Sequence, residues 1–173
     1  MPRQHGRLAS QEHCERAESR RLGLFLCHEG SRQPEGEDAA ITGVAGLEAA
    51  SRLMAHVETE DPAEAVAPAR RLLSTRDRPT AIVAQTDGVA IGVIRAAREM
   101  GLRVPDEISI IGYNDQAEAA QADPPLTTFA CPREEHGRTA VEMLLAASEG
   151  RYSSPQRRVL TARLVVRGST APR

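Results

Sequence analysis

The residues best suited to chemistry by type stand together at Cys27, His28 and Glu29. A thiol, an imidazole and a carboxylate in contact could form a nucleophilic site or bind zinc. They follow the apolar run Leu22 to Cys27, however, and neighbours on a strand point to opposite faces of a sheet. We therefore interpret His28 as an ordinary polar residue at a strand tip.

No other pattern indicates catalysis or a metal. Cys14, Cys27 and Cys131 are odd in number and widely spaced, which fits neither a disulfide framework nor a zinc site. The sequence has no Gly-x-Ser-x-Gly elbow, no phosphate-binding Gly-rich loop and no His-Glu-x-x-His helix. We expect a protein that is not an enzyme and holds no cofactor or metal.

Binding chemistry is better represented, at Tyr113, Asn114 and Asp115, which follow the apolar run Ile108 to Gly112. In open parallel sheets, ligands bind outside the carboxyl ends of the strands. Three hydrogen-bonding side chains at such an end form a candidate binding site. A strand-to-helix turn alone would also favour Asn and Asp, so both interpretations stay open here.

Two further strand tips carry polar residues, at His28 to Ser31 and at Gln85 to Asp87. The topology of a parallel sheet would bring these tips and Tyr113 to Asp115 to one side of a cleft. A sugar or nucleoside needs paired donors and acceptors, because each buried hydroxyl without a partner costs about 1–3 kcal/mol. Acidic and amide side chains could supply them.

The elements that position these tips follow from hydrophobic periodicity. Apolar runs separated by helical patterns predict a βαβ series, and therefore an α/β fold with a doubly wound parallel sheet and flanking helices. The predicted strands are Leu22 to Cys27, Met54 to Val57, Thr80 to Ala84, Ile108 to Gly112 and Val159 to Val166.

Two long helices are predicted with clear ends. The first spans Asp87 to Met100, with Asp87 as its amino-terminal cap and Gly101 closing it. The second spans Pro132 to Ser148, ends before Gly150 and is expected to bury three apolar residues, Val141, Leu144 and Leu145.

A third helix begins at Asp61 to Glu64 but contains Pro68. A proline inside a helix costs about 3 kcal/mol through its missing donor and its ring clash. We therefore expect a kink, or a late start near Ala69.

The composition is typical of a single-domain chain and of a cytoplasmic protein. The chain has 173 residues, 40% of them hydrophobic, and a net charge of −2, with basic residues spread along it. This balance gives no electrostatic surface for nucleic acid. No apolar run reaches about 18 residues and no signal peptide is present, so neither a membrane span nor secretion is indicated.

Several segments carry a family resemblance. GLRVPDEISIIGYND followed by PPLTT, RPTAIVAQTDGVAIGVIRAAREMG, CPREEHGRTAVEMLL and RRVLTARLVVRGSTAPR occur in this order. They resemble the effector-binding domain of the LacI/GalR family of bacterial transcription regulators, strongly from about Arg78 onward. The resemblance implies a periplasmic-binding-protein-like lobe at residues 22–173, preceded by a helical segment at residues 1–21. The segments that carry the resemblance include no helix-turn-helix, so we expect DNA contact only through a headpiece absent from this chain.

The resemblance also implies an effector site and a dimer face. The family's ligand-holding Asp falls on Asn114, the Asn before its helix falls on Thr86, and its cleft Arg falls near Gly43, so the pocket is altered. The effector-binding residues it implies are Thr86, Asp87, Asn114, His28 and Ser31. The dimer-interface residues it implies are Asp87, Ala90, Ile91, Ile94, Gln116, Ala119 and Ala120, although their Ala content also suits ordinary helix packing.

The function implied is effector sensing and dimerisation in a LacI/GalR-type regulator, with a small sugar- or nucleoside-like ligand and a homodimer as partners. The alternative is a free-standing sugar-binding protein of the periplasmic type. A lobe without its counterpart would expose apolar surface, so we expect self-association.

Overall fold

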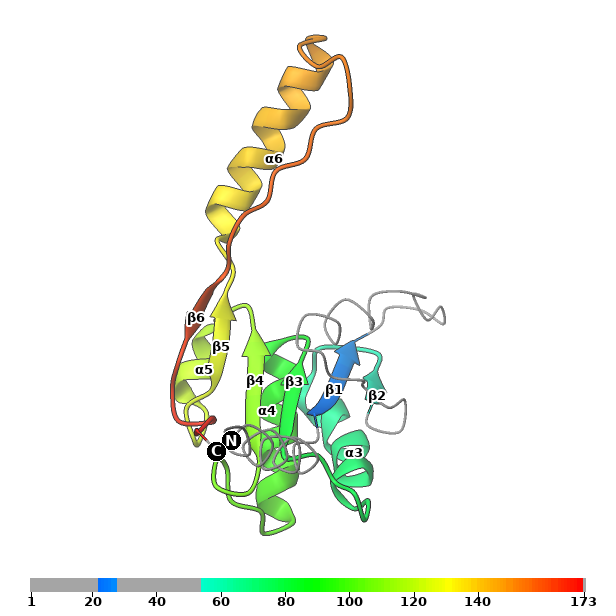
Figure 1. Cartoon of the computed structure of the whole chain (residues 1–173), viewed down its shortest axis with the longest axis vertical. Coiled ribbons are helices and arrows are strands. Elements are labelled where there is room, and N and C mark those ends of the chain that lie inside the picture. Colours follow the sequence, from blue (N-terminus) through cyan, green and yellow to red (C-terminus); the bar gives the residue numbers. More distant parts are fainter. Residues whose placement is uncertain (1–21, 28–53, 173) are drawn as a thin grey trace, which may run out of the picture.

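The computed structural model describes residues 22–27 and 54–172, with side chains from residue 55 onward. They form one six-stranded sheet in the order β2-β1-β3-β4-β5-β6 (Figure 1). Its strands are β1 Leu22–Cys27, β2 Met54–Val57, β3 Ala81–Ala84, β4 Ser109–Tyr113, β5 Thr127–Ala130 and β6 Arg163–Val165. The helices are α3 Pro62–Leu73, α4 Asp87–Glu99, α5 Ala117–Gln121 and α6 Arg133–Ser148.

The sheet is parallel from β2 to β5, as predicted, but β6 pairs antiparallel with β5. Strand β5 was not predicted, because Thr127 and Thr128 give it a polar sequence. Both threonines are nevertheless buried, since each hydroxyl is hydrogen-bonded inside the protein. The strand predicted at Val159 to Val166 is shorter in the structure, where β6 spans Arg163–Val165, the residues that pair with β5.

Helices α3 and α4 pack side by side against one face of the sheet (Figure 1). Small residues allow their close approach, since Ala65 and Ala69 of α3 and Gly92 of α4 are all buried. The apolar core between these helices and the sheet includes Leu72, Leu73, Ile82, Val89, Val93, Ile94, Ile108, Ile110 and Leu126.

Two expectations about helix starts are wrong, namely the late start of α3, which was one of two alternatives beside a kink, and the residue that caps α4. Helix α3 begins at Pro62 and runs through Pro68, rather than starting near Ala69. Asp61 caps it by accepting a hydrogen bond from the Ala63 N–H at 2.8 Å, and burial of its apolar face outweighs the cost of Pro68. Helix α4 is capped by Thr86, not by Asp87, which is its first helical residue.

The prediction for α6 is also wrong in one respect. The helix ends where expected, and Gly150 follows with a φ of +69°. Val141, Leu144 and Leu145, however, are 56%, 69% and 53% exposed instead of buried. Helical periodicity identifies an apolar face but does not say what covers it.

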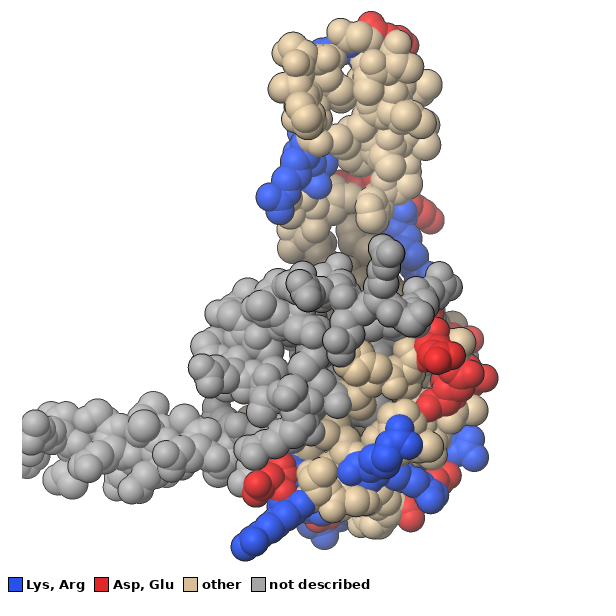
Figure 2. Space-filling model, turned by 90° about the vertical axis from the view of Figure 1, so that its right-hand side faces the viewer, with Lys and Arg blue, Asp and Glu red and all other residues tan. Residues whose placement is uncertain are grey.

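Helix α6 stands away from the sheet (Figure 1). Residues 149–162 run back beside it toward β6, and we call residues 133–162 the arm. Figure 2 shows that most of the visible arm surface is made of residues other than Lys, Arg, Asp and Glu. Within the described part of the chain, the body of the protein therefore leaves the apolar face of α6 open to solvent.

Candidate functional site

The candidate site is the turn that follows β4, residues 113–116, which we call the site turn. Asn114 and Asp115 have φ angles of +109° and +54°, a backbone region that few residues other than Gly adopt and that Asn and Asp tolerate best. The Asn114 N–H donates to the Phe129 carbonyl at 2.9 Å, which continues the pairing of β4 with β5. The turn is thus a fixed extension of the sheet edge.

Asp87 supports this turn from inside the protein. Its side chain is fully buried, its Oδ2 accepts the Gln116 N–H at 2.7 Å and its Oδ1 accepts the Thr128 hydroxyl at 2.5 Å. Gly112 leaves room for the carboxylate, because a Cβ at that position would overlap it. The Asp87 carboxylate therefore joins the start of α4, the site turn and β5.

Two arginines hold the site turn from outside. Arg133 Nη2 donates to the Asn114 carbonyl at 3.1 Å. Arg167 Nη2 donates to Asp115 Oδ1 at 2.6 Å, while its Nη1 donates to the Leu126 carbonyl at 2.8 Å. Sequence reasoning missed both arginines, because Arg167 and Asp115 are 52 residues apart and no local pattern links them.

The site turn also contributes an aromatic side chain. Tyr113 is 38% exposed, and its ring lies 6.4 Å from that of Phe129, centre to centre. The pKa of Tyr113 is raised above its usual value, mainly by a hydrogen bond with Cys131 and to a smaller extent by burial. Its hydroxyl therefore stays protonated at neutral pH. Tyr113 thus offers a neutral hydroxyl and an apolar ring face.

A groove of about 550 Å³ opens beside Tyr113, between α6 and the returning segment of the arm. It is lined by Tyr113, Cys131, Pro132, His136, Thr139, Ala140, Met143, Gln156, Arg157, Arg158, Val159, Leu160 and Ala162. None of the described residues that line it is acidic. The groove therefore combines apolar surface with hydroxyl, amide and basic groups.

The strand tips meet as predicted for the two that the structure describes. Strands β3 and β4 are parallel neighbours, so Thr86 and Asn114 lie at the same edge of the sheet. Thr86 is 5% exposed, and its hydroxyl accepts from the Val89 N–H at 3.4 Å as the helix cap. Asn114 keeps a partly exposed side chain, whereas His28 and Ser31 lie outside the described residues.

The residues implied for the dimer face divide by burial. Asp87, Ala90, Ile94 and Ala119 are buried by this chain's own atoms. The residues that remain at least partly exposed, and so could contact a partner, are Ile91, Gln116 and Ala120. Beside them lies a groove of about 400 Å³, lined by Ile91, Ile94, Arg95, Arg98, Glu99, Ala122 and Asp123.

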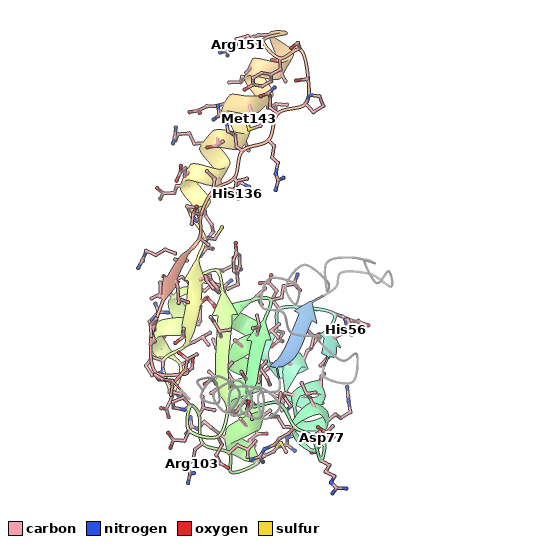
Figure 3. The ribbon with its side chains drawn as sticks, viewed as in Figure 1. His56, Asp77, Arg103, His136, Met143 and Arg151 are labelled. Carbon is pink, nitrogen blue, oxygen red and sulfur yellow. The ribbon has the colours of Figure 1, made fainter. Side chains whose placement is uncertain are left out.

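In the part of the chain that the structure describes, no group of three or more His, Cys, Asp or Glu residues could hold a metal ion. Figure 3 places His136 on the arm and His56 on β2, on different parts of the molecule. Among the same residues, no helix is long and apolar enough to span a membrane.

Comparison with known proteins adds to this geometry. Residues 12–170 match the model of the periplasmic binding protein-like domain. The chain is 39% identical over 101 residues to the transcriptional repressor CytR of Escherichia coli K12, which covers 58% of this chain and 30% of CytR. It is 45% identical over 92 residues to the transcriptional regulator MalR of Streptomyces coelicolor, covering 53% of this chain and 27% of MalR.

Among solved structures, the complex of the transcriptional regulator CelR with cellobiose is similar, with a TM-score of 0.73 and 26% identity. The alignment covers 91% of this chain and 49% of CelR. The chain therefore matches less than a third of the length of the two curated relatives and about half of CelR.

Proposed function

Since the chain belongs to the periplasmic binding protein-like domain family, as the effector-binding domain of a LacI-family regulator, we propose that it binds a small sugar- or nucleoside-like effector at the site turn. Effector binding would then control DNA binding by the regulator to which the domain contributes. The free-standing sugar-binding protein is the less favoured alternative, because CytR, MalR and CelR are all named as transcriptional regulators.

The observation that carries the proposal is the state of the Asn114 side chain. The backbone of Asn114 is fixed through its N–H and its carbonyl, as described above. Within residues 54–172, by contrast, no hydrogen bond engages its side-chain amide. A rigid backbone whose side-chain donor and acceptor are not engaged by the described residues suits recognition of a hydroxyl pair or a base edge, because little ordering is needed on binding.

The neighbouring Tyr113 supports the same ligand class. Its partly exposed ring can pack against the apolar face of a sugar or a base, and its protonated hydroxyl can donate or accept. In this proposal Thr86 and Asp87 do not contact the effector. Thr86 fixes the start of α4 and Asp87 fixes the site turn.

We expect Asn114→Ala to weaken effector binding about tenfold, which corresponds to about 1.4 kcal/mol for lost hydrogen bonds. Isothermal titration with cellobiose and with adenosine, as a sugar and a nucleoside probe, measures the affinity. Ser153→Ala is the control, because Ser153 is an exposed residue at the far end of the arm. If the wild-type protein binds neither probe, the proposed ligand class is wrong; equal binding by Asn114→Ala would remove Asn114 from the site.

We further propose a homodimer through the edge of α4 around Ile91, because this apolar side chain is only partly buried and lines the groove of about 400 Å³. Arg98 and Asp123 form a 3.0 Å ion pair across the same groove, which gives the surface a polar rim. Sedimentation should show Ile91→Asp shifting the protein toward monomer. Leu144→Asp, on the exposed face of α6, should leave the dimer intact; the reverse result would place association on the arm.

A further inference from the structure

The site turn is connected to both segments that join the arm to the body. The chain leaves the sheet after β5 and enters α6, whose first residue is Arg133. It returns through β6, and Arg167 follows two residues after that strand ends. Each of these arginines reaches the site turn, one at the Asn114 carbonyl and the other at the Asp115 carboxylate.

We propose that Arg133 and Arg167 are positioning residues of the effector site, which orient the Asn114 amide through the backbone of the site turn. This inference rests on the proposed function of Asn114. It adds that the orientation of the Asn114 amide depends on the two segments that connect the arm to the body, which carry Arg133 and Arg167. A change in the position of the arm would therefore change the affinity for the effector.

The site turn needs external support because of its backbone conformation. Positive φ angles at two successive residues with a Cβ are disfavoured without surrounding contacts. Hydrogen bonds from charged donors are stronger than neutral ones, and those of Arg133 and Arg167 act on the two strained residues themselves. Asp87 secures the next residue through the Gln116 N–H.

Arg167 is well placed for this task because its own backbone is anchored. Its N–H donates to Thr127 Oγ1 at 2.9 Å. Two residues later, Ser169 is fully buried, donates to the Ile110 carbonyl at 2.6 Å and accepts the Thr127 N–H at 2.8 Å. The guanidinium therefore extends from a fixed point toward the site turn.

The fork of Arg167 also explains why a lysine would not replace it. Its two terminal nitrogens bond acceptors from different parts of the chain, the Leu126 carbonyl before β5 and Asp115 after β4. The single nitrogen of lysine cannot hold this planar two-point geometry. The ion pair is also shielded, with side chains 20% exposed for Arg167 and 24% for Asp115.

Arg133 acts in a complementary way. It bonds the main-chain carbonyl of Asn114 rather than the side chain, so it fixes the residue without occupying the amide. Arg138 offers a matched control on the same helix, because its guanidinium pairs with Glu142 at 3.0 Å and does not bond the site turn. Removing its charge therefore changes α6 without releasing Asn114.

The first test needs no effector. Amide spectra of the full chain labelled with ¹⁵N at Asn and Asp would be compared for wild type, Arg133→Gln, Arg167→Gln and Arg138→Gln. We expect the Asn114 and Asp115 resonances to move in the first two variants and to stay in place in Arg138→Gln. Unchanged resonances in both Arg133→Gln and Arg167→Gln would overturn the proposal, whatever the binding result.

The second test uses cellobiose and adenosine as probes. For a probe that the wild type binds, Arg167→Gln should weaken affinity about fivefold, with little recovery in Arg167→Lys and no change in Arg138→Gln. Moved resonances with unchanged affinity would overturn the positioning role. Failure of the wild type to bind either probe would count against the proposed function, and the amide spectra would still decide whether the arginines hold the site turn.

Discussion

Replacing Asp87 by Ala is expected to lower the free energy of unfolding by about 3 kcal/mol. The variant would leave the Gln116 N–H and the Thr128 hydroxyl without their acceptor, and each unpaired buried group costs about 1–3 kcal/mol. Because Asp87 is fully buried, water cannot replace the carboxylate without opening the start of α4. Urea denaturation followed by circular dichroism measures the loss.

The control for this prediction is Asp123→Ala. Asp123 pairs with Arg98 at 3.0 Å, but its side chain is 80% exposed. Exposed ion pairs contribute about 0–1 kcal/mol, so this variant should be close to wild type. Equal losses in the two variants would contradict the structural role given to Asp87. The stability loss of Asp87→Asn should lie between those of the two alanine variants. Its amide oxygen can still accept one hydrogen bond, but its amide nitrogen is a donor where the second carboxylate oxygen accepted.

Gly92→Ala is expected to destabilise the protein by about 2 kcal/mol, against the usual trend for helices. An Ala in place of Gly normally stabilises a helix interior by about 1 kcal/mol. Here the added Cβ would overlap the Pro62 carbonyl and lie 2.7 Å from the Ala65 Cβ. Pushing α3 away from α4 costs more than the helix gains, since overpacking of this kind typically costs about 1–3 kcal/mol or more.

Gly137→Ala is the matched test of that balance. Gly137 lies within α6, and a Cβ there would meet no atom within 4 Å. The same substitution should therefore stabilise α6, by up to about 1 kcal/mol. Circular dichroism at the helix minimum during thermal unfolding would compare the two variants. A stabilising Gly92→Ala would mean that α3 and α4 can separate without loss, contrary to the packing described.

Sequence patterns were enough to predict the α/β class, the strands β1 to β4 and the extent of α4. These features depend on local signals, namely apolar runs separated by helical patterns and a glycine after a helix. Gly101, for example, has a φ of +74° and ends α4 as its sequence predicts. The resemblance of the segments from Arg78 onward also gave the family, which the match over residues 12–170 confirms.

The contacts that hold the site, in contrast, join residues far apart in the sequence and could not be predicted from it. Asp87 was expected to cap a helix, yet its carboxylate bonds groups 29 and 41 residues away. Arg167 meets Asp115 across 52 residues, and the apolar face of α6 is exposed although its sequence is amphipathic. Periodicity specifies which side of an element is apolar, but which side chain meets which partner depends on where distant segments lie after folding.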